Sequence, residues 1–369
     1  MPALTFTNQL PALEITKTDK EVLLRLENEL MASYLNQYSQ HLQRVKTDNT
    51  KCRGSKCREI RKNENLRVFE ERSSADIPSI LMLGSVAGTL DDVMYGAVAA
   101  TDAEQRIKDR VLRDGVEQSK VLYCFVQPTE DDPTRHVSIK WQLYNTRDYV
   151  CLDTTGFARS SSGELVGYSL SHSVGFEQLP SFEHHSIDRG KRSICVFYRQ
   201  CAPTTVECYA RGFFDFETEM KSDPVFHSVA LQVIANQWVS HARINELAHM
   251  KKLAWRMKEN GAMLAKTQSS LSTRSTCAIC NKSMGMLSSI KSCGICSSLI
   301  CSRCCIKKLV CSLDDKSDSV SETSRPFCKR CIHEVSRSNT MELARKEIQT
   351  NTPTDSYMSP ISADEVESH

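Results

Sequence analysis

Ten of the 17 cysteines in this 369-residue chain lie in one short stretch, between Cys277 and Cys331. The N-terminus, MPALTFTNQLPALEITK, has no basic start followed by an apolar segment, so it does not resemble a secretory signal. We therefore expect a cytoplasmic protein, in which reducing conditions disfavour disulfides and clustered cysteines serve as metal ligands.

Eight of the clustered cysteines form four Cys-x-x-Cys pairs. Each pair can present two thiolates to one tetrahedral ion, so four pairs predict two closed sites and two zinc ions. A closed site leaves no coordination position for water, and its zinc is structural. Cys305 and Cys311 are left as free thiols or as substitutes for a neighbouring ligand. The pairs are Cys277 with Cys280, Cys293 with Cys296, Cys301 with Cys304, and Cys328 with Cys331.

The sequence before these cysteines predicts an α+β domain. Thr18 and Glu21 form a capping-box pattern that predicts the start of a long amphipathic helix. Asp223-Pro224 predicts the start of a second long helix, which continues to about residue 264. Between them lie segments typical of strands, interrupted by two predicted helices at 89–100 and 102–112. The predicted strands are 66–72, 79–86, 116–126, 135–144, 148–157, 164–173, 192–201 and 206–216.

This order of elements resembles the START-type lipid-transfer fold, in which a curved antiparallel sheet grips a long C-terminal helix. The segment Arg147-Asp148-Tyr149-Val150 is similar to a strand motif of that family, and the resemblance covers residues 18–264. It implies an apolar cavity between the sheet and the last helix that holds a lipid or sterol; the alternative is an interior filled by side chains. We interpret Arg147 and Asp148 as a structural ion pair rather than as contacts to a ligand head group.

The cysteine spacing resembles the FYVE zinc finger, whose ligand pairs interleave. RING-type fingers share that arrangement but include a histidine, and the sequence has none between the first and last clustered cysteines. The FYVE resemblance implies that Cys277, Cys280, Cys301 and Cys304 hold one zinc and that Cys293, Cys296, Cys328 and Cys331 hold the other.

The finger departs from FYVE members that bind phosphatidylinositol 3-phosphate. Those members carry an Arg/Lys-His-His-Cys-Arg run, and only Lys291 keeps a charge in the corresponding segment 289–294. Lys291 is therefore the candidate phosphoinositide-binding residue, and we expect weak contact with anionic membranes rather than selective recognition of one phosphoinositide. The apolar segment 284–287 is either an insertion tip or a loop packed on the finger.

These observations predict a START-like domain at 18–264 after an extension at 1–17, a linker at 265–275, a finger at 276–336 and a disordered tail at 337–369. We expect a non-enzymatic lipid-binding or membrane-adaptor protein, peripheral at endosomal or other intracellular membranes. The alternative is a scaffold whose finger docks a protein partner and whose START-like domain carries no lipid.

Other classes of function fit the sequence less well. No nucleophile elbow or phosphate-binding glycine loop occurs, which argues against an enzyme. The formal net charge of +2 and the lack of a base-reading helix argue against nucleic acid as a partner.

Overall fold

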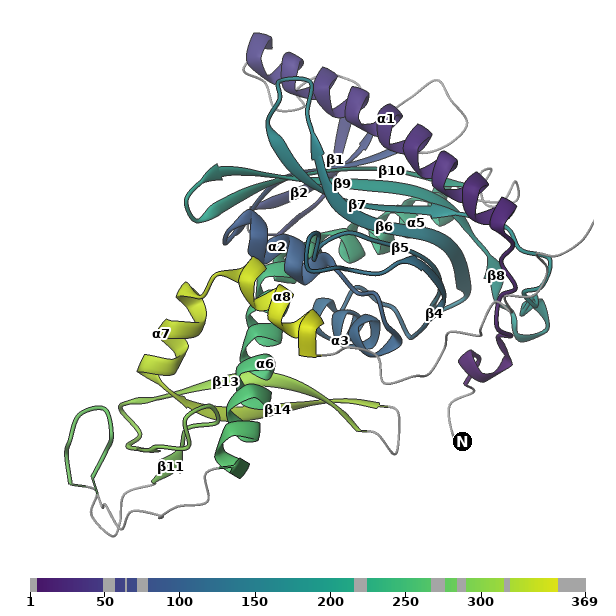
Figure 1. Ribbon diagram of the computed structural model, residues 1–369. Helices are drawn as coiled ribbons and strands as arrows, with labels where there is room; N and C mark the ends of the chain where they lie inside the picture. Colours follow the sequence, from purple (N-terminus) through teal and green to yellow (C-terminus); the bar gives the residue numbers. More distant parts are fainter. Residues whose placement is uncertain are drawn as a thin grey trace, which may run out of the picture.

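The computed structural model describes residues 5–48, 57–63, 65–71, 79–215, 224–266, 276–283, 290–314 and 319–350. A large, curved antiparallel sheet with helices against both of its faces dominates the molecule, which confirms the α+β class (Figure 1). Its strand order is β1-β2-β3-β10-β9-β7-β6-β5-β4, and the short β8 pairs in parallel with β6. The strands are β1 Cys57–Asn63, β2 Leu66–Glu71, β3 Ser79–Ala87, β4 Gln118–Val126, β5 His136–Tyr144, β6 Arg147–Arg159, β7 Leu165–Ser173, β8 Asp188–Arg189, β9 Lys191–Ala202 and β10 Thr205–Asp215.

Helix α1 (Lys17–Asp48) lies across the outer face of this sheet (Figure 1). Tyr38 stacks on Phe197 of β9 with ring centroids 5.0 Å apart. Glu27 pairs with Arg135 at 2.7 Å, and the Glu27 side chain is only 3% exposed. Apolar contacts and one buried ion pair therefore fix the helix on the sheet.

The start of α1 differs from the predicted capping box. The Asp19 N–H donates to Thr16 Oγ1 at 3.1 Å, and the Thr16 N–H donates to Asp19 Oδ2 at 3.0 Å. This reciprocal pair has the same i, i+3 spacing as Thr18 and Glu21, so the capping residues lie two positions earlier than the sequence suggested.

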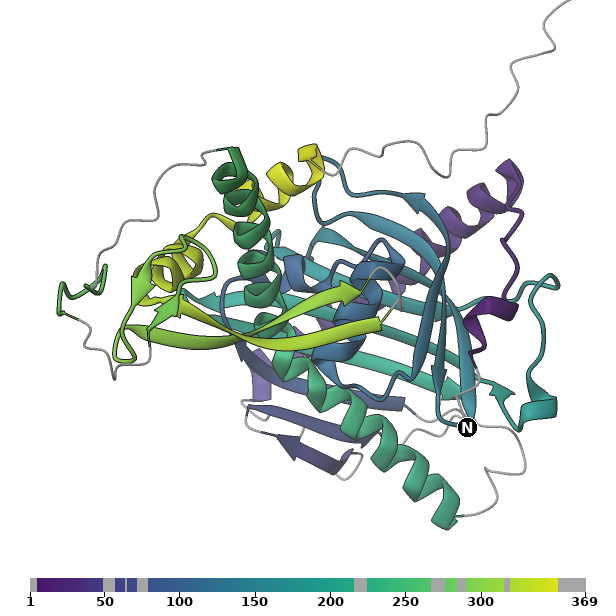
Figure 2. The same ribbon diagram turned by 90° about the horizontal axis from the view of Figure 1, so that it is seen from below.

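Among the described residues, the helices between β3 and β4 and those after β10 cover the inner face of the sheet (Figure 2). The predicted long closing helix is interrupted, because η3 separates α5 from α6. Trp238 of α5 packs so closely on Gly212 of β10 that a Cβ there would lie 2.7 Å from the indole ring. Only glycine allows this approach. The elements are α2 Leu90–Ala97, α3 Asp102–Leu112, α5 Pro224–Val239, η3 Ser240–Arg243 and α6 Ile244–Lys266.

The cysteine-rich region contains a short strand pair, a long hairpin and two helices. The hairpin β13–β14 extends from the cysteine clusters across α6 and contacts α3 (Figure 2). Arg113, the residue directly after α3, donates to Glu322 of β14 at 3.2 Å, which joins the hairpin to the sheet domain. The elements are β11 Lys291–Ser292, β12 Leu299–Ile300, β13 Cys305–Asp314, β14 Ser319–Cys328, α7 Lys329–Arg337 and α8 Thr340–Thr350.

Two segments differ from the sequence interpretation. Residues 340–350 of the predicted disordered tail form α8, whose Leu343 and Ala344 are buried against Tyr95, Ala248 and Trp255. Residues 57–63 form the edge strand β1, which lies before the first predicted strand. The apolar segment 284–287, residues 267–275 of the predicted linker and residues 351–369 lie outside the described residues.

Candidate functional site

The structure brings the eight paired cysteines together in two groups. In each group the four Sγ atoms lie within 4.8 Å of one another. The groups match the interleaved arrangement: the first pair joins the third, and the second joins the fourth. They are Cys277, Cys280, Cys301 and Cys304, and Cys293, Cys296, Cys328 and Cys331.

The sulfur geometry of these groups suits a tetrahedral thiolate site. Zinc–sulfur bonds of about 2.3 Å place two ligand sulfurs about 3.8 Å apart in a tetrahedron. The Sγ atoms of Cys280 and Cys301 are 3.8 Å apart, and those of Cys296 and Cys328 are 4.0 Å apart. The residues present therefore fit a zinc ion in each group.

A backbone N–H donates a hydrogen bond to the first cysteine of each group. The Cys301 N–H donates to Cys277 Sγ at 3.4 Å, and the Cys328 N–H donates to Cys293 Sγ at 3.3 Å. Burial acts to raise the pKa of the Cys277 thiol, but several backbone donors outweigh it and lower this pKa to about 6. The turn after Cys277 ends at Asn281, whose φ of 56° lies in the left-handed region that asparagine tolerates.

Helix α6 forms part of the same small core as the cysteines. Leu253 is 1% exposed and packs with the buried cysteines, together with Phe327 and Val335. Gly294 donates its N–H to Pro326 O at 2.8 Å, and a Cβ on it would lie 3.1 Å from Phe327. The cysteine-rich region and helix α6 of the larger domain therefore share one hydrophobic core.

A second candidate site, which the sequence interpretation missed, lies on the inner face of β5, β6 and β7. Ser138, Asp153 and Ser171 are in register across these strands and form one row. Lys140 Nζ lies 2.6 Å from Asp153 Oδ1, and the Asp153 side chain remains 14% exposed in the middle of the sheet. Water can therefore reach a polar cluster enclosed between the sheet and its helices.

Burial and charge control the ionisation of this cluster. Burial, together with the nearby Lys140 ammonium, lowers the pKa of His136 to about 4. Burial raises the pKa of Asp109 on α3 to about 7, although the Ser119 hydroxyl donates to that carboxylate at 2.5 Å. The Asp153 carboxyl is mostly buried, but Lys140 and His136 hold its pKa well below its usual range.

The polar row continues into an apolar surface on the same face. Ser171 is in register with Ile194 of β9, and Ile194 with Gly212 of β10. Beyond Gly212 lies Ile80 of β3, which is fully buried. The inner face thus has a polar half over β5–β7 and an apolar half over β9, β10, β3 and β2.

The sequence contained a signal for this arrangement. His136, Ser138 and Lys140 alternate with apolar residues along β5, a pattern that usually indicates a strand with one face in water. Here helices cover that face as well, and the polar side chains are buried. Alternation of polar and apolar residues indicates that one face of a strand is polar. It does not show whether that face contacts solvent or an enclosed polar interior.

The predicted ion pair between Arg147 and Asp148 is wrong. Asp148 accepts hydrogen bonds from Trp141 Nε1 at 2.6 Å and from Arg189 Nε at 2.7 Å. Adjacent residues on a strand point to opposite faces, and Asp148 lies on the outer face with Trp141. Its role is to hold β5, β6 and β8 together.

Lys291 lies on β11, in register with Ile300, and is partly exposed. The neighbouring Ile290 and Leu299 are 46% and 36% exposed. The structure therefore places one cation beside two exposed apolar side chains at the edge of the cysteine-rich region.

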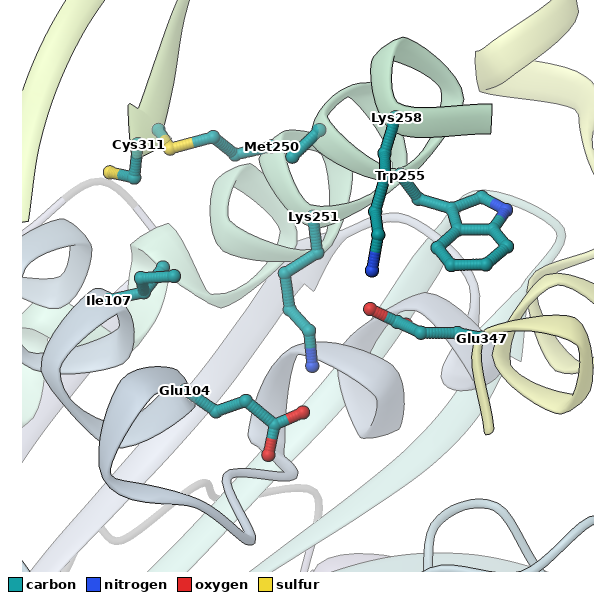
Figure 3. Close-up of a pocket in the computed structure, with 9 residues that line it drawn as sticks. Glu104, Ile107, Met250, Lys251, Trp255, Lys258, Cys311 and Glu347 are labelled. Carbon is teal, nitrogen blue, oxygen red and sulfur yellow. The ribbon is translucent and has the colours of Figure 1, made fainter. Parts of the chain in front are cut away.

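A pocket of about 170 Å³ lies between α3, α6, β13 and α8 (Figure 3). Glu104, Lys251 and Glu347 point toward one another at its mouth. Lys251 Nζ donates to Tyr95 O at 3.0 Å, and Glu347 accepts from the Tyr95 hydroxyl at 2.7 Å. Glu104 accepts from the backbone at the start of α3. The hydrogen bonds of Lys251 and Glu347 to Tyr95 therefore stabilise the packing of α6 and α8 against α2.

No helix among the described residues is long and apolar enough to cross a membrane. No family model and no curated protein matches the sequence. Among solved structures, human StAR-related lipid transfer protein 5 aligns at 16% identity and a TM-score of 0.36, covering 59% of this chain and 99% of that one. Human STARD10 aligns at 11% identity and a TM-score of 0.38, covering 62% and 88%. The human StarD13 (DLC2) lipid transfer and protein localization domain aligns at 14% and 0.34, covering 55% and 95%. Similarity at this level does not transfer a ligand or an activity.

Proposed function

We propose that this chain is a non-enzymatic lipid-binding protein whose ligand lies on the inner face of the main sheet. The observation that carries the proposal is the division of that face into a polar half and an apolar half. An amphipathic lipid has the same division, with a polar head group and an apolar body. The resemblance of residues 18–264 to START domains supports the same function.

The cysteine-rich region is a structural module in this proposal. Zinc, when bound by the two groups of four thiolates, supplies folding free energy and no reaction chemistry. Lys291 with its exposed neighbours Ile290 and Leu299 provides a weak, charge-dependent contact with intracellular membranes. The module therefore acts as a membrane adaptor for the lipid-binding domain.

Native mass spectrometry of the full chain, purified without detergent, tests the function. The expected spectrum shows the protein with two zinc ions and an additional mass that organic extraction removes and identifies as a lipid. A protein that carries only zinc, and that takes up no lipid from mixed vesicles, would instead favour the protein-interaction scaffold.

A further inference from the structure

Cys305 directly follows the proposed zinc ligand Cys304 but belongs to neither group of four cysteines. It begins strand β13, where it is in register with Cys328 of the second group. The Cys305 side chain is partly exposed, whereas Cys328 is 0% exposed. A sulfur outside both groups therefore lies across the hairpin from a proposed metal ligand.

The backbone hydrogen bonds around these two residues show which kind of cross-strand pair they form. The Lys329 N–H donates to Cys304 O at 3.3 Å, one position outside the pair. The Cys328 N–H donates to Cys293 Sγ at 3.3 Å rather than across the hairpin. Both observations are typical of a non-hydrogen-bonded pair in an antiparallel hairpin. Cys305 and Cys328 form such a pair.

A non-hydrogen-bonded pair brings two side chains close together on one face of a hairpin. The Cα atoms of such a pair lie about 4.5 Å apart. A disulfide spans Cα separations of about 4.4–6.8 Å. Cys305 and Cys328 can therefore be joined by a disulfide without a change in the register of β13 and β14.

Cys311, the other clustered cysteine outside both groups, lacks this arrangement. It is in register with Glu322 and is 7% exposed. Burial raises the pKa of the Cys311 thiol to about 11, so this thiol stays protonated and reacts slowly at neutral pH. Strand register and exposure therefore distinguish Cys305 from Cys311.

We propose that Cys305 is a site of reversible oxidation by peroxides and that Cys328 resolves the oxidised form, which opens the second group of thiolates. The Cys305 sulfur attacks one oxygen of hydrogen peroxide. An S–O bond forms, the O–O bond breaks, and water leaves with the thiol proton. The Cys328 thiolate then attacks the resulting sulfenic acid, so the disulfide forms and hydroxide leaves. Two electrons from the two sulfurs reduce one peroxide, and Cys328 is no longer a ligand.

Oxidation of this pair should also affect the neighbouring helices. Cys328 is the N-cap of α7, and its Sγ accepts from the Cys331 N–H at 3.3 Å. Leu253 of α6 packs in the same small core. We therefore expect faster hydrogen exchange in α7 and in the adjoining part of α6 after oxidation. The inference concerns the cysteine-rich region alone and does not depend on a lipid ligand.

Peroxide treatment of the zinc-loaded full chain tests the site. A chromogenic chelator that leaves the untreated protein intact measures the zinc released by hydrogen peroxide. We expect one of the two zinc ions to be released, together with a Cys305–Cys328 disulfide detected by mass spectrometry of unreduced peptides. Dithiothreitol with added zinc should restore the second ion. Release of no zinc, equal release of both ions, or disulfides that do not include Cys305 would each overturn the proposal.

Cys305→Ala removes the proposed reactive sulfur and keeps all eight cysteines of the two groups. It should still bind two zinc ions and should release the second at least about tenfold more slowly, because oxidation must then begin at a metal-bound thiolate. Equal rates in Cys305→Ala and the wild type would refute the role of Cys305. A variant that bound only one zinc would show that Cys305 is itself a ligand, which would also overturn the proposal.

Cys201→Ser is the matched control. Cys201 is an exposed thiol outside both groups, so it can react with peroxide without opening either of them. This variant should release zinc at the rate of the wild type. Slower release from Cys201→Ser, to the same extent as from Cys305→Ala, would show that the loss of any exposed thiol has this effect and would contradict the assignment.

Discussion

Lys252 Nζ lies 2.5 Å from Asp92 Oδ1, and the Lys252 side chain is only 2% exposed. The same carboxylate oxygen accepts a hydrogen bond from Thr340 Oγ1 at 2.6 Å. The three residues belong to α6, α2 and α8, so one carboxylate holds together two helices of the sheet domain and the C-terminal helix.

Lys252→Met should destabilise the protein by about 3 kcal/mol, because it leaves the Asp92 carboxylate partly buried without its cation. Chemical denaturation followed by tryptophan fluorescence measures the change. The double variant Lys252→Met/Asp92→Leu should recover part of the loss, since it removes the unpaired charge. A single variant as stable as the wild type would show that the pair contributes nothing.

Metal analysis of the intact protein should return two zinc ions per chain. Cys301→Ser and Cys296→Ser should each bind one, because each substitution opens one of the two groups of thiolates. Cys201→Ser serves as the control, since Cys201 is an exposed free thiol outside both groups. One zinc in the wild type, or two in Cys301→Ser, would contradict the grouping.

The sheet domain should stay folded in Cys301→Ser, because its main core lies apart from the cysteine cluster. Far-ultraviolet circular dichroism should therefore retain its strand signal. Hydrogen exchange should become faster in α6, where Leu253 loses its packing against the cysteines. Loss of the whole strand signal would instead show that the two parts fold as one unit.

The two buried histidines should make stability fall as the pH decreases from about 6.5 to about 4. Burial is the leading cause that lowers the pKa of both His136 and His241 to about 4 in the folded state, whereas an unfolded histidine titrates near 6.5. Unfolding then takes up protons at these residues, so their contribution to stability is complete above pH 6.5 and decreases by up to about 1.4 kcal/mol per pH unit for each histidine. Asp109 acts in the opposite direction over the same range, because burial raises its pKa to about 7 in the folded state. Denaturant midpoints of the wild type and of His241→Asn across this range isolate the histidine effect, since the variant should lose less stability on acidification. Equal losses in the two proteins would contradict it.

Binding to liposomes should follow total negative charge rather than the position of a phosphate on inositol. One lysine near an anionic surface contributes about 1 kcal/mol, so Lys291→Ala should weaken sedimentation with anionic vesicles by about fivefold. Salt should weaken it further. Tight binding to phosphatidylinositol 3-phosphate alone at physiological salt, abolished in Lys291→Ala, would contradict this prediction.

Local patterns predicted most of the secondary structure, because strands and capped helices depend on near neighbours. The predicted strand at 79–86 and the helix at 102–112 correspond to β3 and α3. Local patterns could not predict the break at η3 or the folding of α8, since both depend on tertiary packing. Trp238 packs on Gly212 just before η3, and Leu343 is buried only because Tyr95 and Trp255 lie beneath it.

The two candidate sites also differ in how far they could be predicted from the sequence. The cysteine groups could be predicted because spacing along the chain limits which thiolates can share an ion. The row of Ser138, Asp153 and Ser171 could not, because register between strands brings together residues from three separate segments. Serine carries no sequence signal that separates a buried position from an exposed one.

The strand order affects how fast the sheet forms and how long its apolar surface stays exposed during synthesis. Within the run from β4 to β7, consecutive strands pair with each other. Strand β3, in contrast, pairs with β10, which is synthesised only after the intervening strands. Pairings between distant segments form slowly because a long loop must close first. During synthesis the edge of β3 therefore stays unpaired until β10 emerges, and the apolar inner side of β2 and β3, with Val68, Ile80 and Met82, stays uncovered until α5 and α6 follow. A nascent chain stalled before residue 205 should engage chaperones or aggregate, whereas one extended past α6 should not.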